Sequence, residues 1–586
     1  MPTGELLLIT LLHLVMTALP MVAAALLAAR AGVRSVPVLL AVGLAAGALV
    51  GFLSFWAYFG GRTLGESATY LALIGSAWAI GWALWGARLD RALLRSLAIP
   101  LALWALASVF LVFFGFAHGG AGEPINASLA RFSHQLPSDS QIPFFFSEWF
   151  FENGHNGTPP IFPGEWLFSD RPPLQVGYTL SQRPISPGSS ELNYQVLGVM
   201  LQQLWVIGLW GLLLAARVKP LTRGLVLVAV LVSDVALVNG FFVWPKMLPA
   251  ALLVAMAALV LTPIWDELRG SLWAAALIAA LAALALLGHG SSVFGVVPLL
   301  IVAGIRGLPS WRWLAVAVGV GAVLMGSWSA YQKYEDPPGN RLAKWTLAGE
   351  PEIDDRGTLE TVTDAYSSAG FGEVLHYKAQ NVVTIFGGAP MVLSLKATIE
   401  AGEMNQIGRA FRVIQFFNLV PGLGLLLLGP LLMIAGWARR RERPEEWNLA
   451  LLCFAVFAIG TAIWALLVFG NGVDRTVKHI SSYLLPLLAI VGGVVGMRAV
   501  FPRFAFWYVA VASALSLALY APALDPLPGT SYSASAIALA GLGLAGFVYL
   551  ALRPPGEPRE PLAGPADRAK PRAAADAGAV AAGVPS

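Results

Sequence analysis

Runs of about twenty apolar residues recur along the whole chain, and they constrain its fold more than any other feature. The hydrocarbon core of a bilayer is about 30 Å thick, so a helix needs roughly 20 apolar residues to cross it. Hydrophobic residues make up 57% of the 586 residues and charged residues only 12%. Soluble domains carry about 25% charged residues. The composition therefore excludes a water-soluble globule and a disordered chain, and it predicts an all-α polytopic membrane protein.

The chain contains about fifteen such segments, in three groups of four, six and five. The expected spans are residues 5–29, 36–60, 69–85, 97–117, 195–216, 224–243, 247–262, 271–287, 291–305, 313–330, 413–437, 448–470, 480–497, 504–520 and 531–552. Two long polar stretches separate the groups. The predicted units are a four-helix segment (1–117), a first polar stretch (118–194), a six-helix segment (195–330), a second polar stretch (331–410), a five-helix segment (411–552) and a tail (553–586).

The positive residues of the short loops predict how the chain is oriented, because Lys and Arg prefer the cytoplasmic side. If Arg30 and Arg34 face the cytoplasm, strict alternation places seventeen positive residues in cytoplasmic short loops and four in the opposite ones. Both long polar stretches are then extracytoplasmic loops, and the tail is cytoplasmic. The tail is rich in Pro and Ala and lacks apolar periodicity, so we expect it to be disordered.

Composition narrows the class of protein further. Arg outnumbers Lys by 29 to 8, a bias typical of GC-rich bacterial genomes, so we expect a multi-pass protein of the bacterial plasma (inner) membrane. The net charge of +4 gives no nucleic-acid-binding footprint. The single cysteine, Cys453, excludes internal disulfides and cysteine-based metal sites. His134 and His155 could approach a metal together with loop carboxylates, but no ligand spacing of the HExxH type accompanies them. The sequence therefore predicts no cofactor.

The first polar stretch carries the residues best suited to chemistry. Asp139 follows Pro137 shortly after the fourth expected span. Residues 142–151 place aromatic side chains at helical spacing, which is typical of a short amphipathic helix in the membrane interface. Arg171 then precedes two prolines and Leu174, and such prolines can start a helix. An arginine at the depth of lipid headgroups can bind a phosphate through two parallel hydrogen bonds.

This order of features resembles the GT-C superfold of membrane glycosyltransferases, which includes the protein O-mannosyltransferases and the bacterial aminoarabinose transferases. A second similarity lies at Tyr483-Leu-Leu-Pro486, which is similar to a segment that opens a late helix in such enzymes. The similar motifs cover about a tenth of the chain. The chain departs from the family's pattern in three ways. Its acidic residue follows the fourth span rather than the first, Arg171 stands where lysine is commoner, and Asp139-Ser140 replaces a frequent Asp-Glu pair.

The resemblance implies a role for each of two residues. A sugar on a polyprenyl-phosphate carrier is attacked at its anomeric carbon by an acceptor hydroxyl. Asp139 would act as the general base, a role that typically contributes about 10²–10⁴-fold, and Arg171 would bind the lipid phosphate and stabilise its charge. The residues also fit simpler roles. Asp139 can belong to a Ser-Asp-Ser turn or a helix cap, and Arg171 can be an interfacial residue whose charge reaches the headgroups.

Further residues are candidates for the same cavity. Arg475, Lys478 and His479 gather three basic groups at one external helix start, and Lys246 lies at the external end of another span. These four are candidate lipid-phosphate ligands. The remaining cavity candidates are Asp170, His289, Asp234 and Glu148. Each also has a structural alternative: Asp170 can pair with Arg171, Glu148 can lie on a solvated helix face, and Asp234, within a span, can hydrogen-bond a neighbouring helix.

The sequence therefore predicts a membrane glycosyltransferase that moves a monosaccharide from a polyprenyl-phosphate carrier to an extracytoplasmic acceptor. The acceptor is a glycan, a lipid or a protein of the cell envelope, the other partner is the lipid bilayer, and no nucleic acid is involved. Two alternatives remain. A lipid-linked glycan transporter or flippase would place polar groups along its spans, and an O-antigen-type polymerase or ligase would use external arginine and histidine without a loop carboxylate.

Overall fold

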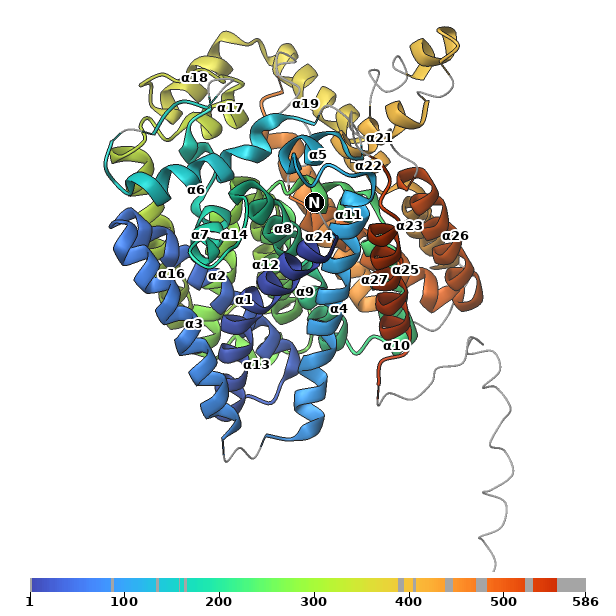
Figure 1. The fold of residues 1–586 in the computed structure, drawn as a ribbon. Coiled ribbons are helices and arrows are strands. Elements are labelled where there is room, and N and C mark those ends of the chain that lie inside the picture. The colour runs from blue at the N-terminus through green and yellow to red at the C-terminus, as the bar shows by residue number, and fades with distance from the viewer. Residues whose placement is uncertain are drawn as a thin grey trace, which may run out of the picture.

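The computed structural model describes ten ranges of the chain. These are residues 3–85, 89–132, 136–157, 159–162, 166–387, 395–403, 407–437, 446–470, 482–521 and 531–555. Within these ranges the secondary structure is helical, apart from an isolated bridge between Phe162 and Trp166. Figure 1 shows the helices packed side by side in one body, with most helices of the two long polar stretches toward the same end. Most of the predicted tail, from residue 556 onward, lies outside the described residues.

The N-terminal helices follow the apolar segments closely. They are α1 (Thr3–Arg30), α2 (Val36–Phe59), α3 (Arg62–Leu84) and α4 (Arg91–Gly115). Local sequence sets their ends. A proline stands in the first turn of α2, and Gly61 then breaks the chain with a φ of +127°, a conformation that side chains disfavour. The Asp90 side chain caps α4 by accepting a hydrogen bond from the Ala92 amide at 3.0 Å.

The first polar stretch folds into short helices that pack on the others. They are α5 (Pro124–Ala130), η2 (Ser138–Gln141), α6 (Ile142–Asn153), η3 (Phe168–Asp170) and α7 (Pro173–Gln182). Helix α6 forms where the aromatic spacing predicts it. Its aromatic side chains pack against α2 and the end of α16: Phe150 stacks on Phe55 at 4.7 Å between ring centroids, and both Phe146 and Phe150 contact the ring of Tyr331. Helix α7 is buried along its whole length.

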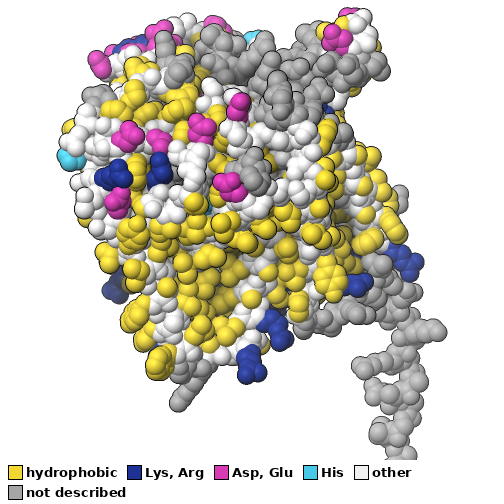
Figure 2. Space-filling model, in the orientation of Figure 1, with side chains coloured by type: hydrophobic (Ala, Val, Ile, Leu, Met, Phe, Trp, Pro, Cys, Tyr) yellow, Lys and Arg dark blue, Asp and Glu magenta, His cyan; other side chains and the backbone are white. Residues whose placement is uncertain are grey.

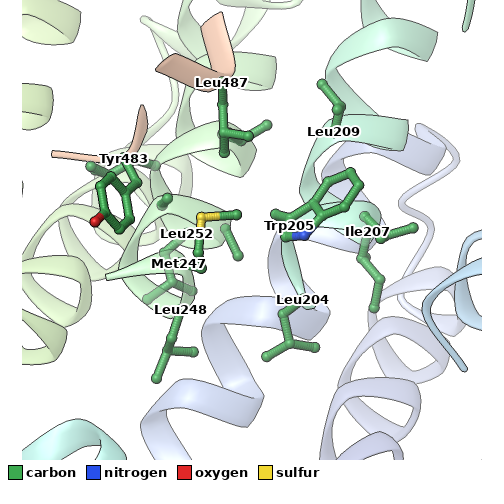
Figure 3. Packing of buried hydrophobic residues seen from close by; sticks show 14 of the residues in the cluster. Leu204, Trp205, Ile207, Leu209, Met247, Leu248, Leu252, Tyr483 and Leu487 are labelled. Atoms are coloured by element: carbon green, nitrogen blue, oxygen red, sulfur yellow. The ribbon is translucent and has the colours of Figure 1, made fainter. Parts of the chain in front are cut away.

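The central helices form the most deeply buried part of the protein. They are α8 (Ser190–Gln202), α9 (Trp205–Ala215), α10 (Pro220–Leu231), α11 (Asp234–Phe242), α12 (Met247–Val260), α13 (Trp265–Leu268), α14 (Leu272–Gly288), η4 (Gly290–Ser292), α15 (Val293–Arg306) and α16 (Trp311–Tyr334). Gly208 lets α9 and α12 approach closely, because an added Cβ would lie 2.6 Å from the carbonyl oxygen of Ala251. Figure 3 shows this core, in which residues of α9 and α12 lie with Tyr483 and Leu487.

The remaining helices divide between the second polar stretch and the C-terminal group. The second polar stretch contains α17 (Arg341–Ala348), α18 (Thr358–Ser368) and α19 (Phe371–Ile385). The C-terminal group contains α21 (Ile407–Phe417), α22 (Leu419–Gly422), η6 (Gly424–Leu427), α23 (Leu428–Trp437), α24 (Glu446–Leu467), α25 (Leu484–Val500), α26 (Pro502–Tyr520) and α27 (Ala534–Leu552). All residues of α25 are buried, whereas in the apolar helices α26 and α27 only a minority of residues is buried.

The described residues contain nine helices that are long and apolar enough to cross a membrane, or ten if one bent pair counts as a span. The predicted total of fifteen is not confirmed. Helix α12 has 14 residues, and α14 and α25 have 17 each, so these apolar segments are shorter than a full crossing. The segment expected at 413–437 is divided among four short helices. The expected span at 224–243 is bent by 51° between α10 and α11.

The outer surface matches a chain whose middle lies in lipid. Figure 2 shows a broad apolar surface across this face, acidic side chains above it, and Lys and Arg side chains both above and below it. Exposed apolar side chains occur along α3, α16, α26 and α27, which are the helices of the periphery. The structure thus supports the coarse prediction of an all-helical membrane protein with many spans.

Candidate functional site

Two residues of the first polar stretch, 32 positions apart in sequence, form a buried ion pair. Nη2 of Arg171 donates a hydrogen bond to Oδ2 of Asp139. Asp139 is 6% exposed and Arg171 is 3% exposed. Local sequence positions both residues. Pro137 leads into the 3₁₀ turn η2, which carries Asp139, and Pro172 with Pro173 ends the extended segment of Arg171 by starting α7.

The ion pair leaves part of each charged group without a partner. Nη1 of Arg171 donates to the carbonyl oxygen of Asp170 at 3.1 Å, and the guanidinium lies 4.8 Å from the ring centroid of Trp166. Within the described part of the chain, Nε of Arg171 and Oδ1 of Asp139 are buried and have no hydrogen-bond partner. A buried polar atom without a partner is costly. The site therefore has the capacity to bind one more hydrogen-bond donor and one more acceptor.

Lys246 brings a second cation to the same place. It follows Trp244-Pro245 between α11 and α12 and is 3% exposed. Its Nζ lies 3.8 Å from the ring centroid of Trp244 and 5.4 Å from that of Tyr483. Burial lowers the pKa of Lys246 to about 7, while the charge of Asp139 opposes this change and that of Arg171 adds to it. An ammonium group with this pKa changes its charge within the physiological range.

Asp139 is affected in the opposite direction. Burial raises the pKa of its carboxyl group above the usual value, and the charges of Arg171 and Lys246 act against this rise. The two cations thus make the buried carboxylate easier to ionise than a carboxylate buried without them. A raised pKa also makes the carboxylate a better proton acceptor. Asp139, Arg171 and Lys246 therefore form a cluster in which a proton acceptor lies beside two anion-binding groups.

Buried glutamines hold the chain around Lys246. The side-chain amide of Gln175 donates to the Tyr194 hydroxyl at 2.8 Å and to the Val243 carbonyl at 3.0 Å. Oε1 of Gln202 accepts from the amides of Met247 and Leu248, both at 3.0 Å. The Gln202 side-chain amide in turn donates to Oε1 of Gln175 at 3.1 Å. These bonds satisfy the backbone at the end of α11 and the start of α12, and they fix the turn that carries Lys246.

Tyr194 connects this frame to the other side of the cluster. Its hydroxyl donates to the carbonyl oxygen of Ser140 at 2.9 Å, next to Asp139 in sequence. The same hydroxyl accepts from Gln175, so one hydrogen-bond chain runs from η2 through α8 and α7 to the turn before α12. Residues from three separate parts of the sequence are thereby held around the ion pair.

The second polar stretch reaches the site through a second ion pair. The sequence analysis offers an ion pair between Asp170 and Arg171 as one interpretation, but the structure does not show this pair. Its Oδ2 instead accepts from Nη1 of Arg341 at 2.8 Å, and both side chains are 4% exposed. Burial raises the pKa of Asp170, and Arg341 and then Arg171 act against that rise. The reason for the pairing is geometric, because the Arg171 guanidinium is already directed to Asp139 and to the Asp170 carbonyl.

The other predicted site residues lie at varying distances from the cluster. Glu148 makes a two-bond ion pair with Arg183, at 2.9 and 3.2 Å, and both are partly exposed. His289 lies beside Trp244, with ring centroids 6.3 Å apart, so it borders the Lys246 turn. Asp234 is the first residue of α11, at the other end of that helix from Lys246. The predicted basic cluster falls outside the described residues: Arg475, Lys478 and His479.

A cavity of about 480 Å³ lies at the break between α10 and α11. Ser233 and Asp234 line it on one side, and residues of α21, α22, η6 and α26 line the rest, nearly all of them apolar. Leu425, Leu428 and Leu515 line the cavity and are 44–52% exposed, so it reaches the outer surface of the protein.

Several residues of the site were missed at the sequence level. The sequence does indicate that Gln175 and Gln202 are important, because an amide within an apolar helix needs a hydrogen-bond partner. It contains no such indication for Trp166 and Arg341, since their importance comes from contacts between distant segments. Among the described residues, no three His, Cys, Asp or Glu side chains come together where they could hold a metal ion.

Comparison of the chain with protein families, with curated proteins and with solved structures finds no match. The interpretation of the site therefore depends on its own geometry.

Proposed function

We propose that the protein is a membrane glycosyltransferase that uses a polyprenyl-phosphate sugar as its donor and works on the extracytoplasmic side. The observation that supports this proposal most is the buried cluster of Asp139, Arg171 and Lys246. A general base and a phosphate-binding pair are the two elements that the transfer requires. The cluster lies where the two long polar stretches meet, because Asp170, next to Arg171, pairs with Arg341.

The geometry suggests how the reaction proceeds. The acceptor hydroxyl oxygen forms a bond to the anomeric carbon, and the bond from that carbon to the phosphate oxygen breaks. The hydroxyl proton goes to Asp139, and the bonding electron pair leaves with the phosphate. Arg171 and Lys246 stabilise the charge on the released lipid phosphate. In the structure Arg171 is bound to Asp139, so we infer that the donor phosphate replaces Asp139 as the partner of Arg171 and frees the carboxylate for proton transfer.

The cavity at Asp234 supports a lipid-linked donor. Helix α11 has nine residues and joins the cavity, at Asp234, to the turn of Lys246. At 1.5 Å per residue this helix is about 13 Å long. An apolar chain in the cavity would thus lie one short helix away from a headgroup held at Lys246. A cavity of this size is in the range that holds a small organic ligand, roughly 300–1,000 Å³.

The experiment that tests the proposal is a transfer assay with purified protein. The protein is incubated with a panel of polyprenyl-phosphate sugars, and release of the lipid phosphate is followed. We expect release with one sugar class, and a loss of about 10²–10⁴-fold in Asp139→Asn. The matched control is Glu152→Gln, because Glu152 is a carboxylate of the same stretch that is exposed on α6. Wild-type rates in Asp139→Asn, or no release with any sugar, would contradict the proposal.

A lipid-linked glycan transporter is the second candidate, and the break between α10 and α11 favours it. Broken helices with an acidic residue in the membrane are typical of transport sites. Flux of a lipid-linked sugar across proteoliposomes, lost in Asp234→Asn but kept in Asp139→Asn, would select this candidate. An O-antigen-type polymerase or ligase would keep its activity in Asp139→Asn without such flux.

A further inference from the structure

Four buried charged groups form two neighbouring ion pairs in the site. Asp139 pairs with Arg171, and Asp170 pairs with Arg341 of the second polar stretch. All four residues are between 3% and 6% exposed. The charge of Arg171 acts on both carboxylates, whereas Arg341 acts on Asp170. The pairing that the structure shows is therefore one of two arrangements open to Arg171.

We propose that Arg341 is a positioning residue: by occupying Asp170, it leaves Arg171 available to Asp139 and to the donor phosphate. This inference rests on the proposed function, because it assigns Arg171 to phosphate binding. It gives the second polar stretch a part in the site, for which its sequence offers no motif.

The contacts of Asp170 explain why Arg341 is needed. Oδ2 of Asp170 accepts from Arg341 at 2.8 Å and from the Leu167 amide at 3.0 Å. A buried carboxylate that loses its cation must either take up a proton or find another cation. The nearest one is Arg171, whose Nη1 already donates to the Asp170 carbonyl at 3.1 Å. A small rotation of that guanidinium would transfer it from the Asp139 carboxylate to the Asp170 carboxylate.

Trp166 contacts both arginines. The guanidinium carbons of Arg171 and Arg341 each lie 4.8 Å from the centroid of its ring. The isolated bridge to Phe162 fixes the backbone of Trp166 through bonds of 2.9 and 3.2 Å. A guanidinium over an aromatic ring gains an attractive contact. The ring therefore holds both guanidinium groups beside the two carboxylates.

Further bonds attach the second polar stretch to the same turn. Oδ2 of Asp336 accepts from the Ser169 amide at 2.8 Å, and the Gln332 side-chain amide donates to the Ser169 carbonyl at 3.2 Å. Nε of Arg341 donates to the Pro351 carbonyl at 2.6 Å. The turn of residues 168–170 is therefore held from outside by the segment that carries Arg341. Its position, and with it the Asp170 carbonyl that binds Arg171, depends on that segment.

The test compares binding of farnesyl phosphate by purified variants at constant pH. We expect Arg341→Gln to weaken binding by about tenfold to a hundredfold, the loss of one hydrogen bond to a charged group. Adding Asp170→Asn to this variant removes the competing carboxylate, so binding should return to near the wild-type value. The matched control is Lys344→Gln, because Lys344 is a buried cation of the same helix that pairs with Asp354.

A second measurement does not depend on the donor. No hydrogen bond or ion pair joins Asp139 to Arg341 within the described residues. Changes at two sites without shared partners usually add in their effect on melting temperature. If Arg341 acts through Arg171, the shifts caused by Asp139→Asn and Arg341→Gln will not add when the two are combined.

The outcomes separate the two proposals. Unchanged binding in Arg341→Gln, a loss that Asp170→Asn does not restore, or an equal loss in Lys344→Gln would overturn the positioning role. If the wild-type protein binds no farnesyl phosphate and transfers no sugar, the proposed function fails. The melting temperatures then decide the positioning role alone: non-additive shifts support it and additive shifts overturn it.

Discussion

The charge of Lys246 should make donor binding depend on pH in the physiological range. Burial lowers the pKa of this residue to about 7. A polyprenyl-phosphate sugar is a phosphodiester, so its own charge does not change in this range. Lys246 is the cation below its pKa and is neutral above it, so binding of an anionic headgroup should weaken as the pH rises through 7. Ionisation of Asp139, whose pKa burial raises, adds negative charge and acts in the same direction.

The magnitude follows from the fraction of Lys246 that is charged. With a pKa of about 7, that fraction is about 90% at pH 6 and about 10% at pH 8. If only the charged form contributes, the affinity falls by about tenfold over these two pH units. The bound anion raises the pKa of Lys246 in the complex, so the decline begins near pH 7 and ends at that higher pKa, and it cannot exceed one power of ten per pH unit for this single group.

The assay is equilibrium binding of a non-reactive polyprenyl phosphodiester to the detergent-solubilised protein between pH 6 and 8. Lys246→Met should bind more weakly at pH 6 and lose most of the pH dependence. The control is Lys378→Met, because burial lowers the pKa of Lys378 to about 8 but its ammonium binds the Tyr366 hydroxyl and the Val468 carbonyl, away from the cluster. Affinity that is constant or that rises with pH in the wild-type protein would refute this reasoning.

Three further predictions test other parts of the structure. Asp139→Asn should lower sugar transfer by about 10²–10⁴-fold. Its circular dichroism spectrum should be that of the wild type, which shows that the variant is folded. Transfer at the wild-type rate in the folded variant would contradict the role of Asp139 as the base. Gly208→Leu should lower stability by about 1–3 kcal/mol, because its side chain meets the Ala251 carbonyl, whereas Gly75→Leu, where an added Cβ has no neighbour within 4 Å, should melt like the wild type. Asp234→Asn should not lower transfer by the roughly 10²–10⁴-fold expected of Asp139→Asn, since Asp234 lies one helix away from the cluster; an equal loss would place it in the chemistry.

The sequence predicted the helices well where apolar periodicity and local end signals agree. Helices α1 and α2 begin and end within two residues of the expected segments, whereas α3 begins seven residues earlier and α4 begins six residues earlier, at its Asp90 cap. The break between α10 and α11 was missed, although its signal was present. The Ser233 side chain caps α11 by accepting from the Ala236 amide at 3.4 Å, and a serine followed by an acid is a common helix start. Because Ser233 and Asp234 lie inside an apolar run, the sequence analysis interprets Asp234 as a charge within a span and not as part of a helix start.

The pairing of charges in the site could not be read from the sequence in the same way. Asp170 lies next to Arg171 in sequence but binds Arg341, which is 171 positions away. Periodicity describes one helix at a time, and it contains no information on which distant segment reaches a given turn. The roles of Trp166 and Gln202 depend equally on tertiary contacts. Sequence patterns could thus identify Asp139 and Arg171 as candidates, but the partners around them follow from tertiary contacts that the sequence patterns do not contain.

Burial has two opposing effects on Lys246. It disfavours the charged ammonium, which is why the pKa of Lys246 lies at about 7. The same low-dielectric surroundings strengthen the attraction between an ammonium group and a phosphate. A phosphodiester bound beside Lys246 would therefore favour its protonated form, so binding of the proposed donor and protonation of Lys246 are coupled.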